Sequence, residues 1–132
     1  MSYSEVCGRL EDLSKTDRSR LTRLLGTAQL SDRKSRHAAA AYRGGSLLAV
    51  GINTTRVNSP YMETNGVPYP SEHAEEAVLR QIRDPEGTTV YVVRARRDGY
   101  PGLSRPCPRC SQLLRESGCK KVVYTVNEYP VP

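Results

Sequence analysis

Apolar residues recur at helical spacing in two stretches near the start of the chain, residues 2–14 and 17–29. They are Val6, Leu10 and Leu13 in the first stretch and Leu21, Leu24, Leu25 and Ala28 in the second. Spacings of i, i+4 and i+7 predict two amphipathic helices within residues 1–30. Ser14 or Thr16 would cap the second helix, because a hydroxyl oxygen can accept a hydrogen bond from an unpaired N–H of the first turn.

Four later apolar runs are short and predict strands. Residues 37–42 and 46–52 flank Arg43-Gly44-Gly45, and a Gly-Gly pair between two apolar runs indicates a β-hairpin. Residues 88–95 and 120–126 are rich in β-branched residues, which favour strands. The first of these two runs has a continuous apolar centre, which is typical of a strand covered on both faces.

Two further helices are predicted between these strands. Residues 71–83 follow a helical pattern in which Ser71 is a suitable N-cap, which places His73 and Glu75 in the first turn. Residues 107–117 form the second pattern, and Gly118 is well placed to end that helix.

The order of these elements predicts a three-layer α/β/α sandwich. Its mixed sheet would have four strands, a β-hairpin followed by a parallel βαβαβ unit with right-handed crossovers. We expect one domain over residues 1–132, with helices in residues 1–30 and a core in residues 35–126. A sheet of four strands leaves an edge for the N-terminal helices or a second subunit to cover.

Residues 54–70 have no periodicity and are rich in proline, glycine and asparagine. A structureless stretch of this length inside a compact domain usually has a function. Tyr61, Met62 and Tyr69 lie in it and have side chains suited to cover a base. The alternative is a surface excursion without a function.

Composition narrows the cellular setting and the partners. The chain has four Cys, two of them in a C-x-x-C pair, and neither an export signal nor an apolar run long enough to span a membrane, which predicts reduced thiols in the cytoplasm. The net charge is +6, with basic clusters in residues 15–36 and 94–121. Such clusters fit an anionic nucleotide or nucleic acid, although a solvated basic surface is an equal alternative.

Two short motifs carry the chemistry. His73-Ala74-Glu75 offers an imidazole and a carboxylate, and Pro106-Cys107-Pro108-Arg109-Cys110 offers two thiolates. Both motifs open helices of the predicted parallel unit, where ligands bind at the carboxyl ends of strands. Zinc suits one imidazole and two thiolates, and three protein ligands leave its fourth position for water. The pattern predicts a zinc hydrolase in which Glu75 moves the proton.

The Cys pair has two alternative interpretations. A redox dithiol would explain neither His73 nor Glu75, and a structural zinc site needs a fourth protein ligand. The remaining soft side chains that could supply that ligand are Cys7, His37 and Cys119.

These motifs resemble the cytidine and deoxycytidylate deaminase superfamily, in its CMP/dCMP-type branch and most of all its short phage-encoded members. The resemblance spans about residues 35–126 and includes Val50-Gly51-Ile52-Asn53 and Gly118 to Tyr124. It implies Zn²⁺ on His73, Cys107 and Cys110, with Glu75 as the proton shuttle. It also implies that Asn53 contacts the sugar and that the backbone near Ala74 and Ser104 holds the base edge. Apart from the resemblance, Arg105 and Arg109 are candidates for binding a phosphate, and a plain surface placement is an equal alternative for both.

The function expected from residues and resemblance together is hydrolytic deamination of a cytosine nucleoside or nucleotide, dCMP above all, in a cytoplasmic homo-oligomer. One alternative keeps this chemistry but acts on a base in single-stranded DNA or tRNA. A second alternative is a non-catalytic binding module stabilised by zinc. Larger members of the superfamily continue into a further helix and a fifth strand, whereas this sequence ends after residues 127–132.

Overall fold

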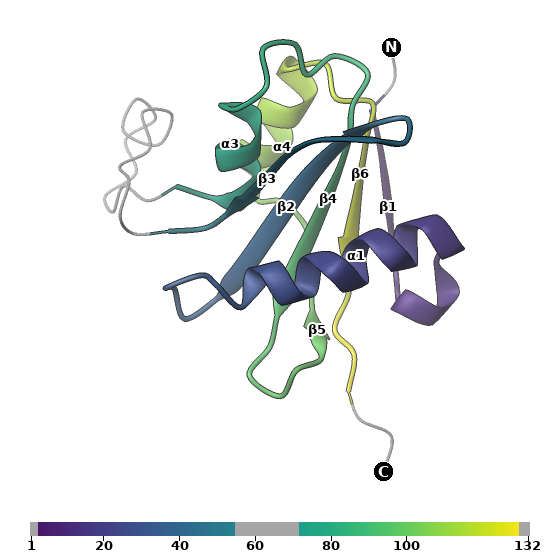
Figure 1. Cartoon of the computed structure of the whole chain (residues 1–132), viewed down its shortest axis with the longest axis vertical. Coiled ribbons are helices and arrows are strands. Elements are labelled where there is room, and N and C mark those ends of the chain that lie inside the picture. Colours follow the sequence, from purple (N-terminus) through teal and green to yellow (C-terminus); the bar gives the residue numbers. More distant parts are fainter. Residues whose placement is uncertain (1–2, 55–71, 130–132) are drawn as a thin grey trace.

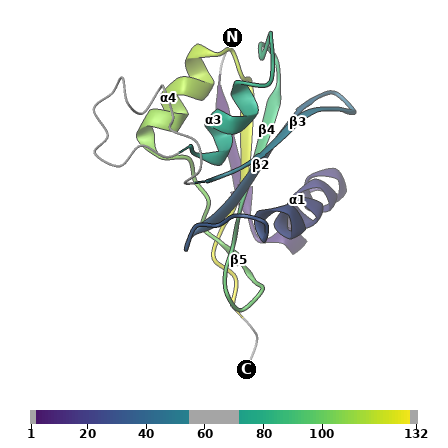
Figure 2. The same ribbon diagram turned by 60° about the vertical axis from the view of Figure 1, so that its left-hand side comes forward.

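The computed structural model describes residues 3–54 and 72–129, and in this part of the chain a six-stranded sheet forms the middle of three layers (Figure 1). Helix α1 covers one face, and α3 and α4 cover the other (Figure 2). The strands are β1 Ser4–Gly8, β2 Arg36–Arg43, β3 Ser46–Ile52, β4 Thr89–Ala95, β5 Pro101–Gly102 and β6 Lys121–Thr125. The helices are the 3₁₀ turn η1 Leu10–Asp12, α1 Lys15–Ala28, α3 Ala74–Leu79 and α4 Pro108–Glu116. Within the described residues, no helix has the length and apolar character needed to cross a membrane.

The sheet is mixed, as predicted. Its order is β1-β6-β4-β2-β3, and the short β5 pairs with the end of β4. Strand β2 is antiparallel to both β3 and β4, and β5 is antiparallel to β4, whereas β4, β6 and β1 run parallel to one another. The predicted hairpin is confirmed, with Gly44 at a φ of +58° in its turn. The predicted number of four strands is wrong, because β1 and β5 also join the sheet.

The helix predicted over residues 2–14 is wrong. This segment forms β1 and then η1, and β1 pairs in parallel with β6 from Ser4 opposite Lys121 to Gly8 opposite Thr125. The three apolar residues at helical spacing, Val6, Leu10 and Leu13, give a helix little packing to stabilise it. Pairing with an open strand edge instead gives the backbone N–H and C=O groups of both segments hydrogen-bond partners. The edge of β6 is therefore paired with the chain's own N-terminal strand. Val6, Leu10 and Leu13 still pack against the core on the α1 side.

Side chains on the two faces of the sheet form two apolar clusters. The four alanines of β2 divide between them, with Ala39 and Ala41 facing α3 and α4 and the other two facing α1. These small residues let the helices approach closely. On β3 the approach is closer still, because a Cβ added to Gly51 would lie 2.7 Å from the Cβ of Ala77 in α3. Only glycine fits at this position.

Both helices of the α3/α4 layer begin close to the predicted residues. Helix α3 starts at Ala74, so His73 is its extended N-cap rather than part of the first turn, and α3 ends at Leu79 instead of residue 83. Ser71 lies outside the described residues. Helix α4 starts after Cys107, its N-cap, and Gly118 ends the helical segment at a φ of +88°.

A polar network joins α1 to the sheet. Ser14 caps α1 by accepting a hydrogen bond from the Asp17 N–H at 3.1 Å. The buried Tyr91 hydroxyl donates to Asp17 Oδ1 at 2.6 Å and accepts from Arg20 Nη1 at 3.1 Å. The Arg20 guanidinium also lies 3.9 Å from the centre of the Tyr42 ring. Burial and the bond to Asp17 raise the pKa of Tyr91 to about 12, so the hydroxyl keeps its proton at neutral pH.

We predict that Tyr91→Phe lowers the free energy of unfolding by about 1–2 kcal/mol, because it removes both hydrogen bonds and leaves Asp17 without the hydroxyl. Urea denaturation followed by circular dichroism measures the change. Tyr100→Phe is the matched control, since Tyr100 is 38% exposed. Equal stability of the two variants would show that the network does not hold α1 on the sheet.

Candidate functional site

Helices α3 and α4 bring the two predicted motifs to one edge of the sheet. His73 is the N-cap of α3, which follows β3, and Cys107 is the N-cap of α4, which follows β4. The two helices lie side by side on the same face (Figure 2). Their N-termini therefore meet at the carboxyl ends of parallel strands, where α/β proteins bind ligands.

His73, Cys107 and Cys110 place their three donor atoms within 4.8 Å of one another. His73 Nδ1 lies 3.3 Å from Cys110 Sγ and 3.9 Å from Cys107 Sγ. Zinc bonds of about 2.3 Å to sulfur and about 2.0 Å to nitrogen set tetrahedral ligand atoms roughly 3.5 Å apart. Among the residues described, this is the one group of three or more such side chains with metal-binding geometry.

The charges of the two thiols support this fit. Hydrogen bonds from Cys110 and His73 lower the pKa of Cys107 to about 3, so its sulfur is a thiolate. The bond to Cys107 and burial raise the pKa of Cys110, because a second negative charge beside the first is opposed. A divalent cation removes this opposition and lets both sulfurs bind as thiolates. The cluster fits Zn²⁺.

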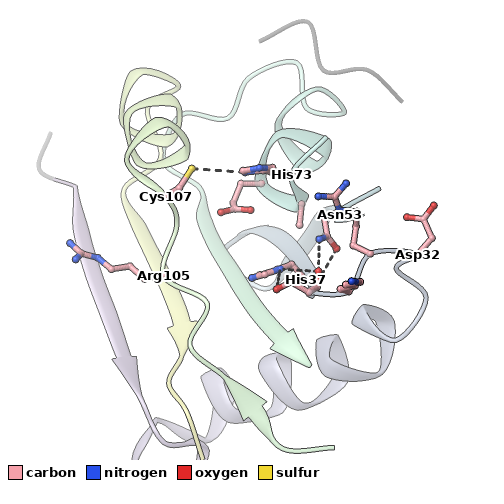
Figure 3. Close-up of a pocket in the computed structure, with 11 residues that line it drawn as sticks. Asp32, His37, Asn53, His73, Arg105 and Cys107 are labelled. Atoms are coloured by element: carbon pink, nitrogen blue, oxygen red, sulfur yellow. Dashed lines mark hydrogen bonds between the residues drawn. The ribbon is translucent and has the colours of Figure 1, made fainter. Parts of the chain in front are cut away.

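The metal cluster opens on a cavity of about 610 Å³ (Figure 3). Its lining includes His73 and Cys107, the backbone start of α3 at Ala74, and the carboxyl-bearing Glu75. Glu75 is only 5% exposed, and burial raises the pKa of its carboxyl group. A buried carboxylate thus lies beside the metal donors in a space large enough for a small molecule.

Asn53 lines the same cavity, but its side chain is engaged within the protein. Its Nδ2 donates to the Ser35 carbonyl at 2.6 Å, and its Oδ1 accepts from Ser31 Oγ at 2.6 Å and from the His37 N–H at 2.9 Å. Figure 3 shows the part of this network that joins Asn53 to the segment at His37. In this structure Asn53 holds the segment that leads into β2. The sugar contact expected of it stays a prediction.

The other two predicted substrate residues lie differently. Ser104 is 2% exposed and does not line the cavity. Its hydroxyl donates to the Val92 carbonyl at 2.8 Å, and its N–H donates to the Thr125 carbonyl. Arg105 does line the cavity, but its guanidinium points toward β1 and pairs twice with Glu5, at 3.0 and 3.2 Å (Figure 3). Their roles at the base edge and phosphate stay predictions.

Two features of the site are not evident in the sequence patterns. His37 and the exposed segment 32–35 also line the cavity, although they belong to the start of β2 and to the connection between α1 and β2 rather than to either motif. Glu72 is 1% exposed and accepts two hydrogen bonds from Arg80, at 2.5 and 2.9 Å. The row of charges at Asp32-Arg33-Lys34, between a predicted helix and a predicted strand, was the available signal for the first feature.

Most of the predicted functional stretch 54–70 lies outside the described residues, including Tyr61, Met62 and Tyr69. The structure does describe the residues on either side of it. Thr54 and Glu72 exchange backbone hydrogen bonds of 3.1 and 3.2 Å in an isolated bridge. The described residues on the two sides of the stretch are therefore adjacent to each other, next to His73.

Comparison with known families gives one match, to the cytidine and deoxycytidylate deaminase zinc-binding region over residues 14–126. The match begins earlier than residue 35, where the resemblance noted in the sequence begins, and it includes α1. No curated protein matches the chain.

Solved structures show the same fold. The dCMP deaminase of cyanophage S-TIM5 in its apo form is 21% identical over 88% of each chain, with a TM-score of 0.59. The same enzyme in complex with dCMP and dUMP is 20% identical over 87% of this chain and 85% of that chain, with a TM-score of 0.60. The guanine deaminase of Bacillus subtilis is 18% identical over 86% of this chain and 64% of that chain, with a TM-score of 0.50.

We predict that the purified protein binds about one zinc ion per chain, and that Cys107→Ser or Cys110→Ser removes most of it, because a hydroxyl is a poor replacement for thiolate. Elemental analysis after dialysis measures the metal content. Cys7→Ser is the control, since Cys7 is exposed and lies on β1. Full zinc content in both site variants would contradict the assignment of ligands.

We predict that Asn53→Ala lowers the free energy of unfolding of the substrate-free protein by about 1–3 kcal/mol, because three side-chain hydrogen bonds are lost and the His37 N–H loses its acceptor. Urea denaturation measures this change. Asn127→Ala, which removes a single exposed bond to the Leu103 N–H, should have a smaller effect. An unchanged stability would mean that Asn53 serves the substrate alone.

Proposed function

Since this chain belongs to the cytidine and deoxycytidylate deaminase family, we propose that it hydrolyses the exocyclic amino group of a cytosine nucleotide, with dCMP as the preferred substrate. Water and the cytosine ring give the uracil ring and ammonia. The observation that carries the proposal is the meeting of a His/Cys/Cys cluster and a buried carboxylate, Glu75, in one cavity.

In this proposal His73, Cys107 and Cys110 hold the zinc. When bound, the zinc acts as a Lewis acid that makes a water molecule a good nucleophile near neutral pH. The half-buried His73 and Cys107 lie on the cavity side of the cluster, whereas Cys110 is fully buried. Two of the three ligands are therefore reached from the cavity, where the substrate would enter.

Glu75 moves the protons. Its carboxylate accepts a proton from the attacking water and delivers it to the ring nitrogen next to C4. It then takes the second proton of that water, now on the hydroxyl at C4, to the departing amine. The C4–N bond then breaks and ammonia leaves. Glu75 belongs to the first turn of α3, one residue beyond the cavity-lining Ala74, so its position relative to His73 is set by the helix.

Two observations support a nucleotide such as dCMP. The phage enzyme with the same fold has been captured with dCMP and dUMP. The cavity volume of about 610 Å³ falls within the range that small-molecule sites occupy.

A cytoplasmic location is also part of the proposal. The four cysteines form no disulfide, which fits the reducing conditions of the cytoplasm.

Self-association is also part of the proposal. Strand β3 is at the edge of the described sheet, and its Leu47 is 52% exposed. An unpaired strand edge that carries an exposed apolar side chain fits a contact with a second copy.

The second candidate is a deaminase of a base in single-stranded DNA or tRNA. The net charge of +6 favours it, together with Arg33 and Lys34 in the cavity lining, because a polynucleotide extends a negative backbone past the reacting base. A non-catalytic zinc module has no such support, since the cluster offers three protein ligands and opens on a cavity.

We predict that Glu75→Gln lowers kcat by about 10²–10⁴-fold with unchanged zinc content, because the amide cannot accept the proton of water. Ammonia release and elemental analysis measure the two quantities. Glu116→Gln, on the exposed side of α4, is the control. A fully active Glu75→Gln enzyme would exclude the proposed proton transfer.

Substrate class is tested with deoxycytidine, dCMP, dCTP, a single-stranded oligodeoxynucleotide and tRNA under the same conditions. We expect the highest kcat/KM for dCMP. Ammonia release confined to the polynucleotides would favour the second candidate.

A further inference from the structure

A second hollow of about 200 Å³ adjoins the active-site cavity. The two share part of their lining, the exposed segment Asp32-Arg33-Lys34 between α1 and β2. We call this segment the ridge. Beyond the ridge, the second hollow is lined by Arg36, Ala95 and Arg97.

The second hollow is strongly basic. Arg33, Lys34, Arg36 and Arg97 contribute four positive charges to its lining, and Asp32 contributes one negative charge. Arg36 is half-buried, and its Nη1 donates to Gln29 Oε1 at 2.6 Å, which orients the guanidinium. Arginine presents several N–H donors in a planar fork that matches the oxygens of phosphate.

The backbone of the ridge is held in place from both ends. Ser31 is 6% exposed, and its hydroxyl bonds to the carbonyl and to Oδ1 of Asn53 while accepting from the Arg33 N–H at 3.2 Å. At the other end, Asn53 Nδ2 donates to the Ser35 carbonyl. When an anion binds, side chains on a fixed backbone lose less conformational entropy than side chains on a flexible loop, so a fixed segment binds the anion at a lower cost in free energy.

We propose that the second hollow is a phosphate subsite, in which Arg36 and Arg97 bind a phosphate of the substrate while its base lies beside Glu75 across the ridge. The inference rests on the proposed deaminase function and extends it to substrate selection. The same chemistry serves the phosphate of a free nucleotide and the phosphodiester of single-stranded nucleic acid. In both cases the subsite favours phosphorylated substrates over the nucleoside.

The test compares Arg36→Gln/Arg97→Gln with Arg18→Gln/Arg23→Gln. Each variant loses two positive charges, but Arg18 and Arg23 are exposed on α1 and line neither hollow. For each variant, kcat/KM is measured for deoxycytidine, dCMP, dCTP and a single-stranded oligodeoxynucleotide with one cytosine. Arg97→Glu alone repeats the test without altering a sheet strand, in case the double variant is unstable.

We expect the subsite variants to lose roughly tenfold or more in kcat/KM for phosphorylated substrates and less than about twofold for deoxycytidine, as expected for lost charge-assisted bonds. The control should change all substrates alike or none. A loss for dCMP and dCTP identifies a free nucleotide as the occupant, and a loss confined to the oligonucleotide identifies a phosphodiester. Equal effects on deoxycytidine and every phosphorylated substrate, or no effect, would overturn the subsite.

A binding measurement separates this inference from the function on which it rests. Calorimetry with dUMP and deoxyuridine needs no turnover, and the subsite predicts that the subsite variants lose affinity for dUMP but not for deoxyuridine. If the wild-type protein deaminates none of the substrates, the proposed function fails while the affinity ratio still tests the subsite. An unchanged ratio would overturn the subsite even in an active enzyme.

Discussion

The contact between α3 and β3 is the constraint on which the site depends. Gly51 leaves no room for a side chain against Ala77, so at this position α3 packs directly on the backbone of β3. The alanines of β2 extend this close packing beneath the helix layer. A helix held at this distance has a fixed start, and His73 and Glu75 belong to that start. The metal geometry is thus a consequence of small residues in the core.

Charge then decides what the site can hold. Cys107 is stabilised as a thiolate by the donors around it, whereas a second thiolate at Cys110 is opposed by the first. Without a metal, the protein therefore stabilises one thiolate, at Cys107, and disfavours the second. A bound divalent cation would stabilise both thiolates, because its positive charge offsets their repulsion. The buried Glu75 adds a carboxylate that faces the same cavity. This arrangement suits proton transfer better than redox exchange between the two sulfurs.

The residues proposed to recognise the substrate lie in a different part of the chain. The metal donors and Glu75 lie at the starts of α3 and α4, but the basic ridge lies between α1 and β2, and Asn53 directly follows β3. Asn53 connects these parts, because it lines the cavity while it holds the ridge through Ser31 and Ser35. In the proposed function, the chemistry and the selection of the substrate therefore belong to separate elements that meet at one cavity.

The sequence by itself determined the chemistry and the architecture. Imidazole and thiolate groups are suited to bind zinc wherever they occur, and local capping and periodicity place both motifs at helix starts. The cluster of His73, Cys107 and Cys110 was therefore predictable. The sandwich was predictable from the order of the helical and strand patterns. Only the tertiary structure decided that residues 4–8 form a strand, because parallel pairing with β6 is a contact between segments more than a hundred residues apart. It also decided that the Asn53 side chain is hydrogen-bonded to Ser31 and Ser35 and that Arg105 pairs with Glu5. The spacing of residues along the sequence does not predict these partners, because folding brings them together.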